Sequence, residues 1–139
     1  MTPEDREIYV AHRLDRVGET LADARMLLDE DRLRSAVNRI YYAMFYAVGA
    51  LALRNDFTTG SHAQLRGWFN REFVKTGIVD VSHGKAYGLA FDRRTKSDYD
   101  DQAEFETEEV EDLYRSAEAF VEVLSATLIS PEHPLTLTP

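Results

Sequence analysis

The feature that most constrains the fold is an apolar stretch in the first half of the chain, LRSAVNRIYYAMFYAVGALAL, at residues 33–53. Apolar side chains recur in it at steps of three or four positions, the spacing of one helix face; these are Leu33, Val37, Ile40, Met44, Val48 and Leu51. Alanine and aromatic residues occupy the other faces. Because a helix that is apolar almost all round is buried on most sides, we predict the central helix of a bundle.

Length and composition indicate one globular domain. The chain has 139 residues, of which 44% are hydrophobic and none is cysteine, so it can form one core but has no disulfide framework and no thiolate chemistry. Asn38 and Arg39 inside the apolar stretch argue against a membrane span. The charged first sixteen residues lack the apolar run of a signal peptide. We therefore expect a cytoplasmic protein with no membrane association.

Helix signals recur along the chain, and no strand pattern is visible, so we predict an all-α, up-and-down bundle of about five helices. The predicted helices cover about residues 3–29, 32–54, 62–75, 82–96 and 108–129. Four of them are preceded by a residue that commonly caps a helix N-terminus: Thr2, Asp31, Ser61 and Thr107. We assign residues 1–129 to a single domain and predict that residues 130–139, which contain three prolines, form a flexible tail.

The net charge of −9 is unevenly distributed. Residues 1–31 carry a net charge of −5, residues 32–96 carry +7, residues 97–112 carry −9 and residues 113–139 carry −2. A protein with a net negative charge ordinarily binds nucleic acid poorly. An anion could still bind to the middle segment if the acidic segments fold away from it; the alternative is a mixed, solvated surface.

A short run in the central stretch, Asn38, Arg39, Tyr41 and Tyr42, forms the first candidate site. In a structural interpretation, Arg39 extends to solvent and the tyrosines pack with their hydroxyl groups hydrogen-bonded. In a functional interpretation, Arg39 faces a cleft, where a fixed guanidinium can bind phosphate. These residues alone leave both interpretations open.

The segment RRTKSDY at residues 93–99 is the second candidate, because three cations precede an acid and a tyrosine at a predicted helix end. The cations suit a helix C-terminus electrostatically, and Asp98 could simply pair with one of them. Alternatively, Arg93 and Arg94 face a phosphate group, and Tyr99 stacks on a base or carries a proton.

The histidines form no recognised metal or catalytic motif. There is no HExxH, Walker A or GxGxxG sequence, and no Glu-x-x-His pair. We therefore expect neither a metal site nor a cofactor. His62 follows the predicted cap Ser61 and is expected to be a surface residue of the first turn.

Two motifs resemble the HEPN superfamily, the "higher eukaryotes and prokaryotes nucleotide-binding" domain, in its small stand-alone prokaryotic branch. The first is AVNRIYYAMF at residues 36–45, which is similar to A-x-x-R-x-YYA-x-F. The second is RTKSDY at residues 94–99, which is similar to R-x-x-x-D-Y. The likeness runs from about Leu14 to Leu128 and includes the turn FVKTG at residues 73–77.

The resemblance implies an HEPN-like bundle of four or five helices, commonly a homodimer with its functional cleft at the dimer interface. Many relatives are toxins that cut RNA and are often encoded beside a small nucleotidyltransferase antitoxin. The resemblance therefore implies a nucleotide or RNA as ligand and a nucleotidyltransferase as partner. The expected ligand-binding residues are Asn38, Arg39 and Tyr42 in the first motif, Arg94 in the second, and Arg93 just before it.

The chain departs from the catalytic signature of those toxins, an arginine followed after four to six residues by a histidine. Arg94 is followed at that spacing by Tyr99, and the only such pair is Arg6 and His12 in the first predicted helix. Metal-free RNA cleavage needs a group that moves a proton near pH 7, which suits histidine and not an ordinary tyrosine. Tyr99 is also a candidate acceptor of modification, because some relatives carry a motif tyrosine that the partner nucleotidyltransferase modifies.

Three functions stay open. The first is a homodimeric module that binds nucleotide or RNA phosphate without turnover, in a toxin–antitoxin-like pair with a nucleotidyltransferase. The second is an active, metal-independent endoribonuclease that uses Arg94, Asp98 and Tyr99. The third is a structural or interaction domain. The missing histidine favours the first over the second, and the positive charge of residues 32–96 favours it over the third.

Overall fold

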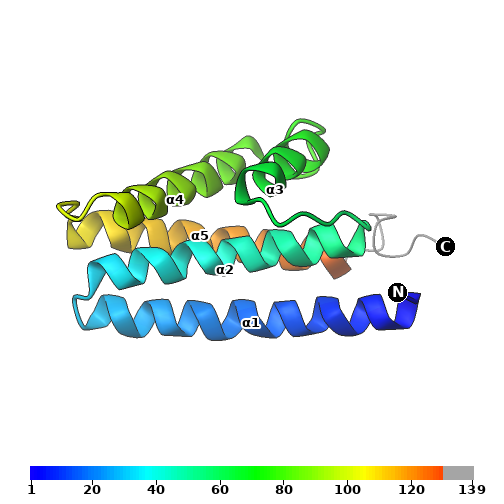
Figure 1. Cartoon of the computed structure of the whole chain (residues 1–139), viewed down its shortest axis with the longest axis horizontal. Helices are drawn as coiled ribbons and strands as arrows, with labels where there is room; N and C mark the ends of the chain where they lie inside the picture. Colours follow the sequence, from blue (N-terminus) through cyan, green and yellow to red (C-terminus); the bar gives the residue numbers. More distant parts are fainter. Residues whose placement is uncertain (130–139) are drawn as a thin grey trace.

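The computed structural model describes residues 1–129, which form an all-α bundle without strands over that range, as predicted (Figure 1). The elements are α1 (Pro3–Asp29), α2 (Leu33–Arg54), α3 (His62–Phe69), a π-helical turn η1 (Asn70–Val74), α4 (Val81–Tyr99) and α5 (Thr107–Ile129). The predicted tail at residues 130–139 lies outside the described residues.

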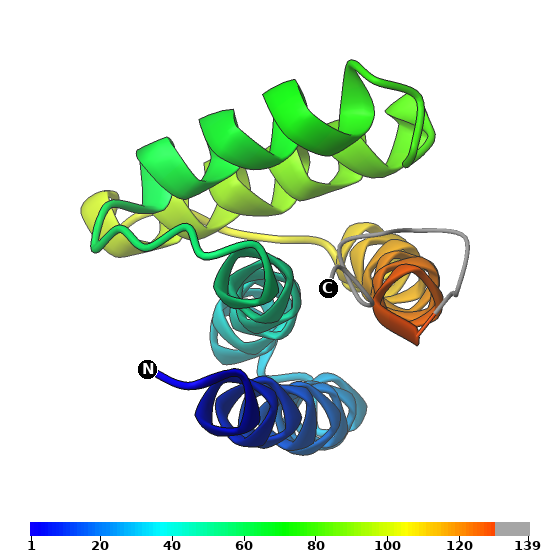
Figure 2. The same cartoon turned by 90° about the vertical axis from the view of Figure 1, so that its right-hand side faces the viewer.

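Helix α2 lies at the centre of the bundle, as its apolar faces predict. Figure 2 shows α1 below α2, α3 and α4 above it, and α5 along one side. Although α2 is long and apolar enough to cross a membrane, 72% of its most apolar window is buried inside the bundle. The side of α2 that faces the viewer in Figure 1 carries no helix. Several residues of α2 are only half-buried, among them Arg39, Tyr42 and Tyr46.

The N-terminal cap of α1 is confirmed, but two predicted caps are wrong. Thr2 caps the helix as predicted, and together with Asp5 it forms a capping box. Asp31 does not cap α2: its φ is 61°, and it ends α1 with two hydrogen bonds of a Schellman motif, from Asp31 N to Leu28 O and from Arg32 N to Leu27 O. Thr107 is the first residue of α5, and its hydroxyl donates to Asp31 Oδ1 at 3.0 Å. The side chains of Asp31 and Thr107, the two residues wrongly predicted to cap helices, are therefore hydrogen-bonded to each other.

Helix α4 extends three residues beyond its predicted end at Lys96 and includes Tyr99. The reason is Arg34, which lies on α2. Its guanidinium donates to the backbone oxygen of Ser97 in the last turn of α4, and also to the backbone oxygens of Asp100, Asp101 and Ala103 just beyond it. Orphan carbonyl groups at this helix end are thus satisfied by a side chain more than sixty residues away in sequence.

The connector between α2 and α3 runs back along α2 and brings the start of α3 over its middle (Figure 1). Ser61 caps α3 as predicted, since its side chain accepts from Gln64 N at 3.2 Å. The side chain of Gln64 bonds to the connector before the cap. Its Oε1 accepts from the Thr59 hydroxyl, which itself accepts from Ser61 N. This arrangement fixes the first residue of α3, His62.

We predict that Arg34→Ala lowers the free energy of unfolding by about 1–3 kcal/mol, because carbonyl groups at the end of α4 lose a charged donor. Urea unfolding measures this change, and hydrogen exchange should rise in residues 97–103. Arg32→Ala is the matched control, because Arg32 is exposed and lies 3.9 Å from its one carboxylate partner, Glu30. Equal stability of the two variants would contradict the role assigned to Arg34.

Candidate functional site

Residues from the two sequence motifs meet at the ring of Tyr42. The guanidinium carbon of Arg39 lies 5.1 Å from the centroid of this ring, and that of Arg94 lies 5.7 Å from it. Arg94 also lies 5.0 Å from the ring centroid of the buried Tyr41. All three distances are in the range of cation–π contacts. The structure therefore joins the motif on α2 to the motif on α4, although more than fifty residues separate them.

Each arginine is oriented by a neighbour on its own helix. Asn38 Oδ1 accepts from Arg39 Nε at 3.0 Å and from Arg39 Nη2 at 2.8 Å. Arg94 Nε lies 3.3 Å from Asp98 Oδ2, one helical turn on. We call Asn38, Arg39, Tyr42, Arg94 and Asp98 the α2–α4 cluster. Within residues 1–129, Arg94 donates no hydrogen bond to another residue and Arg39 pairs with no carboxylate, so both guanidinium groups keep donors for a ligand.

His62 lies beside this cluster, which the sequence did not predict. Its Nδ1 is 2.7 Å from the hydroxyl oxygen of Tyr41, and its ring stacks on Phe45 with centroids 4.3 Å apart. It is half-buried and not the simple surface residue expected from its place after Ser61. The one sequence signal was its position at the start of a capped helix, which does not reveal that the connector folds back over α2.

The surroundings of His62 and Tyr41 change their proton affinities. Burial, and then the positive charge of Arg94, hold the pKa of His62 below its ordinary value. Burial raises the pKa of Tyr41 to about 12, although the nearby Arg94 opposes this effect. At neutral pH the pair is therefore a neutral imidazole hydrogen-bonded to a neutral phenol.

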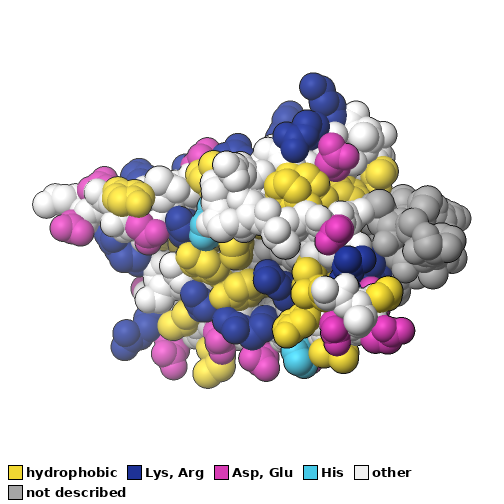
Figure 3. Space-filling view, turned by 45° about the vertical axis from the view of Figure 1, so that its right-hand side comes forward, with side chains coloured by type: hydrophobic (Ala, Val, Ile, Leu, Met, Phe, Trp, Pro, Cys, Tyr) yellow, Lys and Arg dark blue, Asp and Glu magenta, His cyan; other side chains and the backbone are white. Residues whose placement is uncertain are grey.

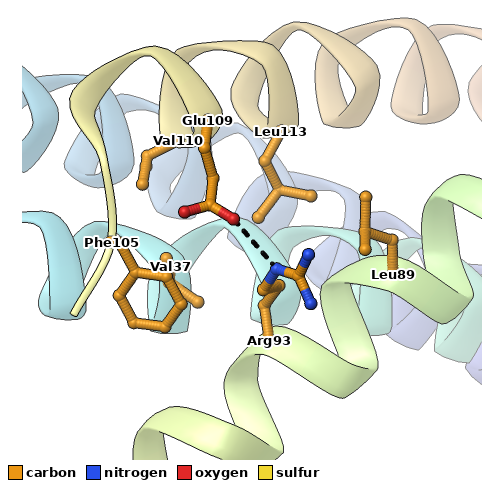
Figure 4. Close-up of a pocket in the computed structure, with 7 residues that line it drawn as sticks. All are labelled: Val37, Leu89, Arg93, Phe105, Glu109, Val110 and Leu113. Atoms are coloured by element: carbon orange, nitrogen blue, oxygen red, sulfur yellow. Dashed lines mark hydrogen bonds and ion pairs between the residues drawn. The ribbon is translucent and has the colours of Figure 1, made fainter. Parts of the chain in front are cut away.

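Two predicted site residues lie apart from the α2–α4 cluster. Arg93 faces α5, where its Nε donates to Glu109 Oε2 at 3.1 Å beside a pocket of about 30 Å³ (Figure 4). This volume holds about one water molecule. Tyr99 is 84% exposed at the end of α4, and its side chain makes no hydrogen bond or aromatic contact with the rest of the described chain. The structure thus brings together Asn38, Arg39, Tyr42, Arg94 and Asp98, and separates Arg93 and Tyr99 from them.

The cluster is suited to bind an anion that carries an aromatic group. Two guanidinium groups offer forked donors to phosphate oxygens, and half-buried Tyr42 offers a ring on which a base can stack. Beside the cluster, His62 adds a neutral imidazole that is able to accept a proton.

The chain matches one family model and several known proteins. A model described as the HEPN domain matches residues 10–127. A UPF0332 protein of Thermotoga maritima is 44% identical over 120 residues, which cover 86% of this chain and 91% of that protein. Two proteins of Methanocaldococcus jannaschii are each 32% identical: "Putative toxin MJ0142" over 84% of this chain and 80% of its own length, and "Putative toxin MJ0605" over 79% and 81%.

We predict that Arg94→Ala raises the pKa of His62, because a nearby positive charge and some burial are removed. Titration of the His62 ring signals by NMR measures this, with His62→Gln to assign them. Arg93→Ala is the control, since the neighbouring Arg93 faces α5 and should leave the titration unchanged.

The same shift has a consequence for stability. Because folding lowers the pKa of His62, the folded state binds fewer protons than the unfolded state. The contribution of His62 to the free energy of unfolding is therefore fully present above about pH 6.5, the ordinary pKa of histidine. This contribution is lost as the pH falls below that value. A His62 that titrates at or above its ordinary pKa would contradict this description of the site.

Proposed function

This chain belongs to the HEPN domain family, as its two motifs predicted, and we propose that it binds the phosphate groups of a nucleotide or RNA at the α2–α4 cluster. The observation that carries the proposal is that Arg39 and Arg94 lie within 6 Å of one ring centroid while only Arg94 has a carboxylate partner in residues 1–129. Two cations at one ring, of which only Arg94 has a carboxylate partner, favour a bound anion.

We further propose that it acts as a homodimer in a toxin–antitoxin-like pair with a nucleotidyltransferase. Two relatives whose names contain the word toxin support the class of system. The high exposure of Tyr99 supports its role as the residue that such a partner would modify, because a transferase must reach the phenol oxygen.

A second candidate function, metal-independent RNA cleavage, is favoured by the position of His62. Its neutral imidazole could accept the proton of a ribose 2′-hydroxyl while the 2′-oxygen attacks the adjacent phosphorus. The bond from phosphorus to the 5′-oxygen then breaks, and that oxygen takes a proton from water. Arg94 and Arg39 would stabilise the charge on the phosphate oxygens. In this scheme His62, and not Tyr99, takes the place of the missing motif histidine.

For the binding function, we predict that Arg94→Ala and Arg39→Ala each weaken binding of fluorescent ATP and short single-stranded RNA by roughly 10- to 150-fold, the effect of losing one charged hydrogen bond. Fluorescence anisotropy across a salt series measures this, and wild-type affinity should fall as salt rises. Arg115→Ala is the control, because Arg115 is exposed on α5 and pairs with Asp112. Wild-type affinity in both cluster variants would contradict the proposal.

The same RNA, incubated in EDTA, separates the two candidate functions. A binding module leaves it intact. A ribonuclease cleaves it, and His62→Gln should then remove cleavage while RNA binding persists. Cleavage that survives His62→Gln but is lost in Tyr99→Phe would return the catalytic role to Tyr99.

The homodimer is tested by light scattering, where we expect twice the chain mass of 15.9 kDa. Apolar side chains exposed on α4 and just before it support a contact there; Ile78, Val81 and Leu89 are 37%, 57% and 44% exposed. Leu89→Asp should shift the protein toward monomer, whereas Met26→Asp, a change at an exposed residue of α1, should not. A monomeric wild-type protein at high concentration would contradict the dimer.

A further inference from the structure

Three arginines on one side of the bundle have no acidic partner within residues 1–129, although the whole chain carries 25 acidic residues. Most arginines of the described chain lie within 4.0 Å of a carboxylate. Four do not, within residues 1–129: Arg34, whose guanidinium donates to backbone oxygens instead, and Arg13, Arg16 and Arg39. In so acidic a protein, unpaired guanidinium groups along one face indicate a surface available to an external anion.

Arg13 and Arg16 border a hollow of about 320 Å³ between α1 and α2, which we call the α1–α2 hollow; its lining is Tyr9, His12, Arg13, Arg16 and Tyr46. Arg16 repeats the arrangement seen at Tyr42. Its guanidinium carbon lies 4.8 Å from the ring centroid of Tyr46, and its Nη2 donates to the Tyr46 hydroxyl at 3.0 Å. Tyr46 is therefore oriented by an arginine from another helix.

Gly49 allows Arg13 to lie against α2. A Cβ atom at this position would come within 2.7 Å of Arg13 Nη1, so the missing side chain leaves room for the guanidinium. Arg13 thus sits close to the α2 backbone, one turn beyond Tyr46 along α2.

The hollow continues the α2–α4 cluster. Tyr42 and Tyr46 are one helical turn apart on α2, and their ring centroids are 5.9 Å apart. Two tyrosine rings therefore lie side by side, and each has at least one arginine guanidinium over it: Arg39 and Arg94 at Tyr42, and Arg16 at Tyr46. Figure 3 shows Lys and Arg side chains in dark blue bordering a yellow hydrophobic patch over this part of the molecule.

We propose that the α1–α2 hollow is a second subsite, which holds the next phosphate and base of a single-stranded polynucleotide whose first phosphate lies at the α2–α4 cluster. The inference rests on the proposed function for the first phosphate and identifies its ligand as a strand, not a mononucleotide. Alternating cations and aromatic rings along a groove are what a single strand requires, because its phosphates and bases alternate in the same way. A mononucleotide would leave the ring of Tyr46 and its arginine unused.

The test compares a fluorescent adenosine mononucleotide with a short single-stranded RNA on the full chain. The double variant Arg13→Ala, Arg16→Ala should bind RNA about tenfold more weakly and bind the mononucleotide as wild type does. The slope of log affinity against log salt should become shallower by roughly 0.7 for each phosphate that the double variant no longer neutralises. Tyr46→Ala should weaken RNA binding by roughly 5- to 150-fold because a base can no longer stack there, and Tyr46→Phe should retain most of the affinity.

The controls separate failure of this inference from failure of the proposed function. If Arg94→Ala abolishes binding of both ligands while the Arg13, Arg16 double variant binds RNA as wild type does, the first site exists and the second subsite is wrong. If wild type binds neither ligand, the proposed function fails as well. If the double variant changes the mass in light scattering and binds both ligands equally weakly, the surface is an interface between copies and the inference is overturned. Circular dichroism confirms that each variant is folded.

Discussion

The burial of α2 is the constraint on which the rest of the structure depends. Neighbouring helices lie below it, above it and along one side and cover its apolar residues there, whereas Arg39, Tyr42 and Tyr46 stay half-buried and mark the side that remains. With 3.6 residues per turn, that side presents Arg39, Tyr42 and Tyr46 on successive turns. Helix α2 thus contributes to the hydrophobic core on three sides, and on the fourth it lies beneath a surface lined by cations and aromatic rings.

Tyr41 connects this surface to the core. Its ring is fully buried and stacks on Tyr87 at an interplanar angle of 9°, while Arg94 lies over it and its hydroxyl bonds His62. The arginine and the imidazole therefore both rest on a ring that core packing holds in place. Such support lowers the conformational entropy that binding would otherwise cost.

The sequence was most informative where local chemistry decides the structure. The periodicity of α2 and the cap residue Thr2 were sufficient to predict those elements, and the two motifs singled out Arg39 and Arg94, which the structure places at one tyrosine ring. The sequence was least informative where contacts between residues far apart in the chain determine the local structure. The end of α4 depends on Arg34 of α2, the true roles of Asp31 and Thr107 depend on each other, and His62 reaches Tyr41 because the connector after α2 turns back. Arg93 and Arg94 are adjacent in sequence, yet the helical rotation between them separates their surroundings completely.

The most direct test of the central claim is NMR observation of arginine Nε–Hε signals during titration with a short single-stranded RNA. The account predicts that the Arg39 and Arg94 signals shift together and saturate, because both guanidinium groups contact phosphate. Arg93 is an internal control, since its Nε is bonded to Glu109 on the other side of α4, and its signal should stay in place. Shifts at Arg93 or Arg115 with none at Arg39 and Arg94 would show that the anion binds elsewhere and would contradict the account.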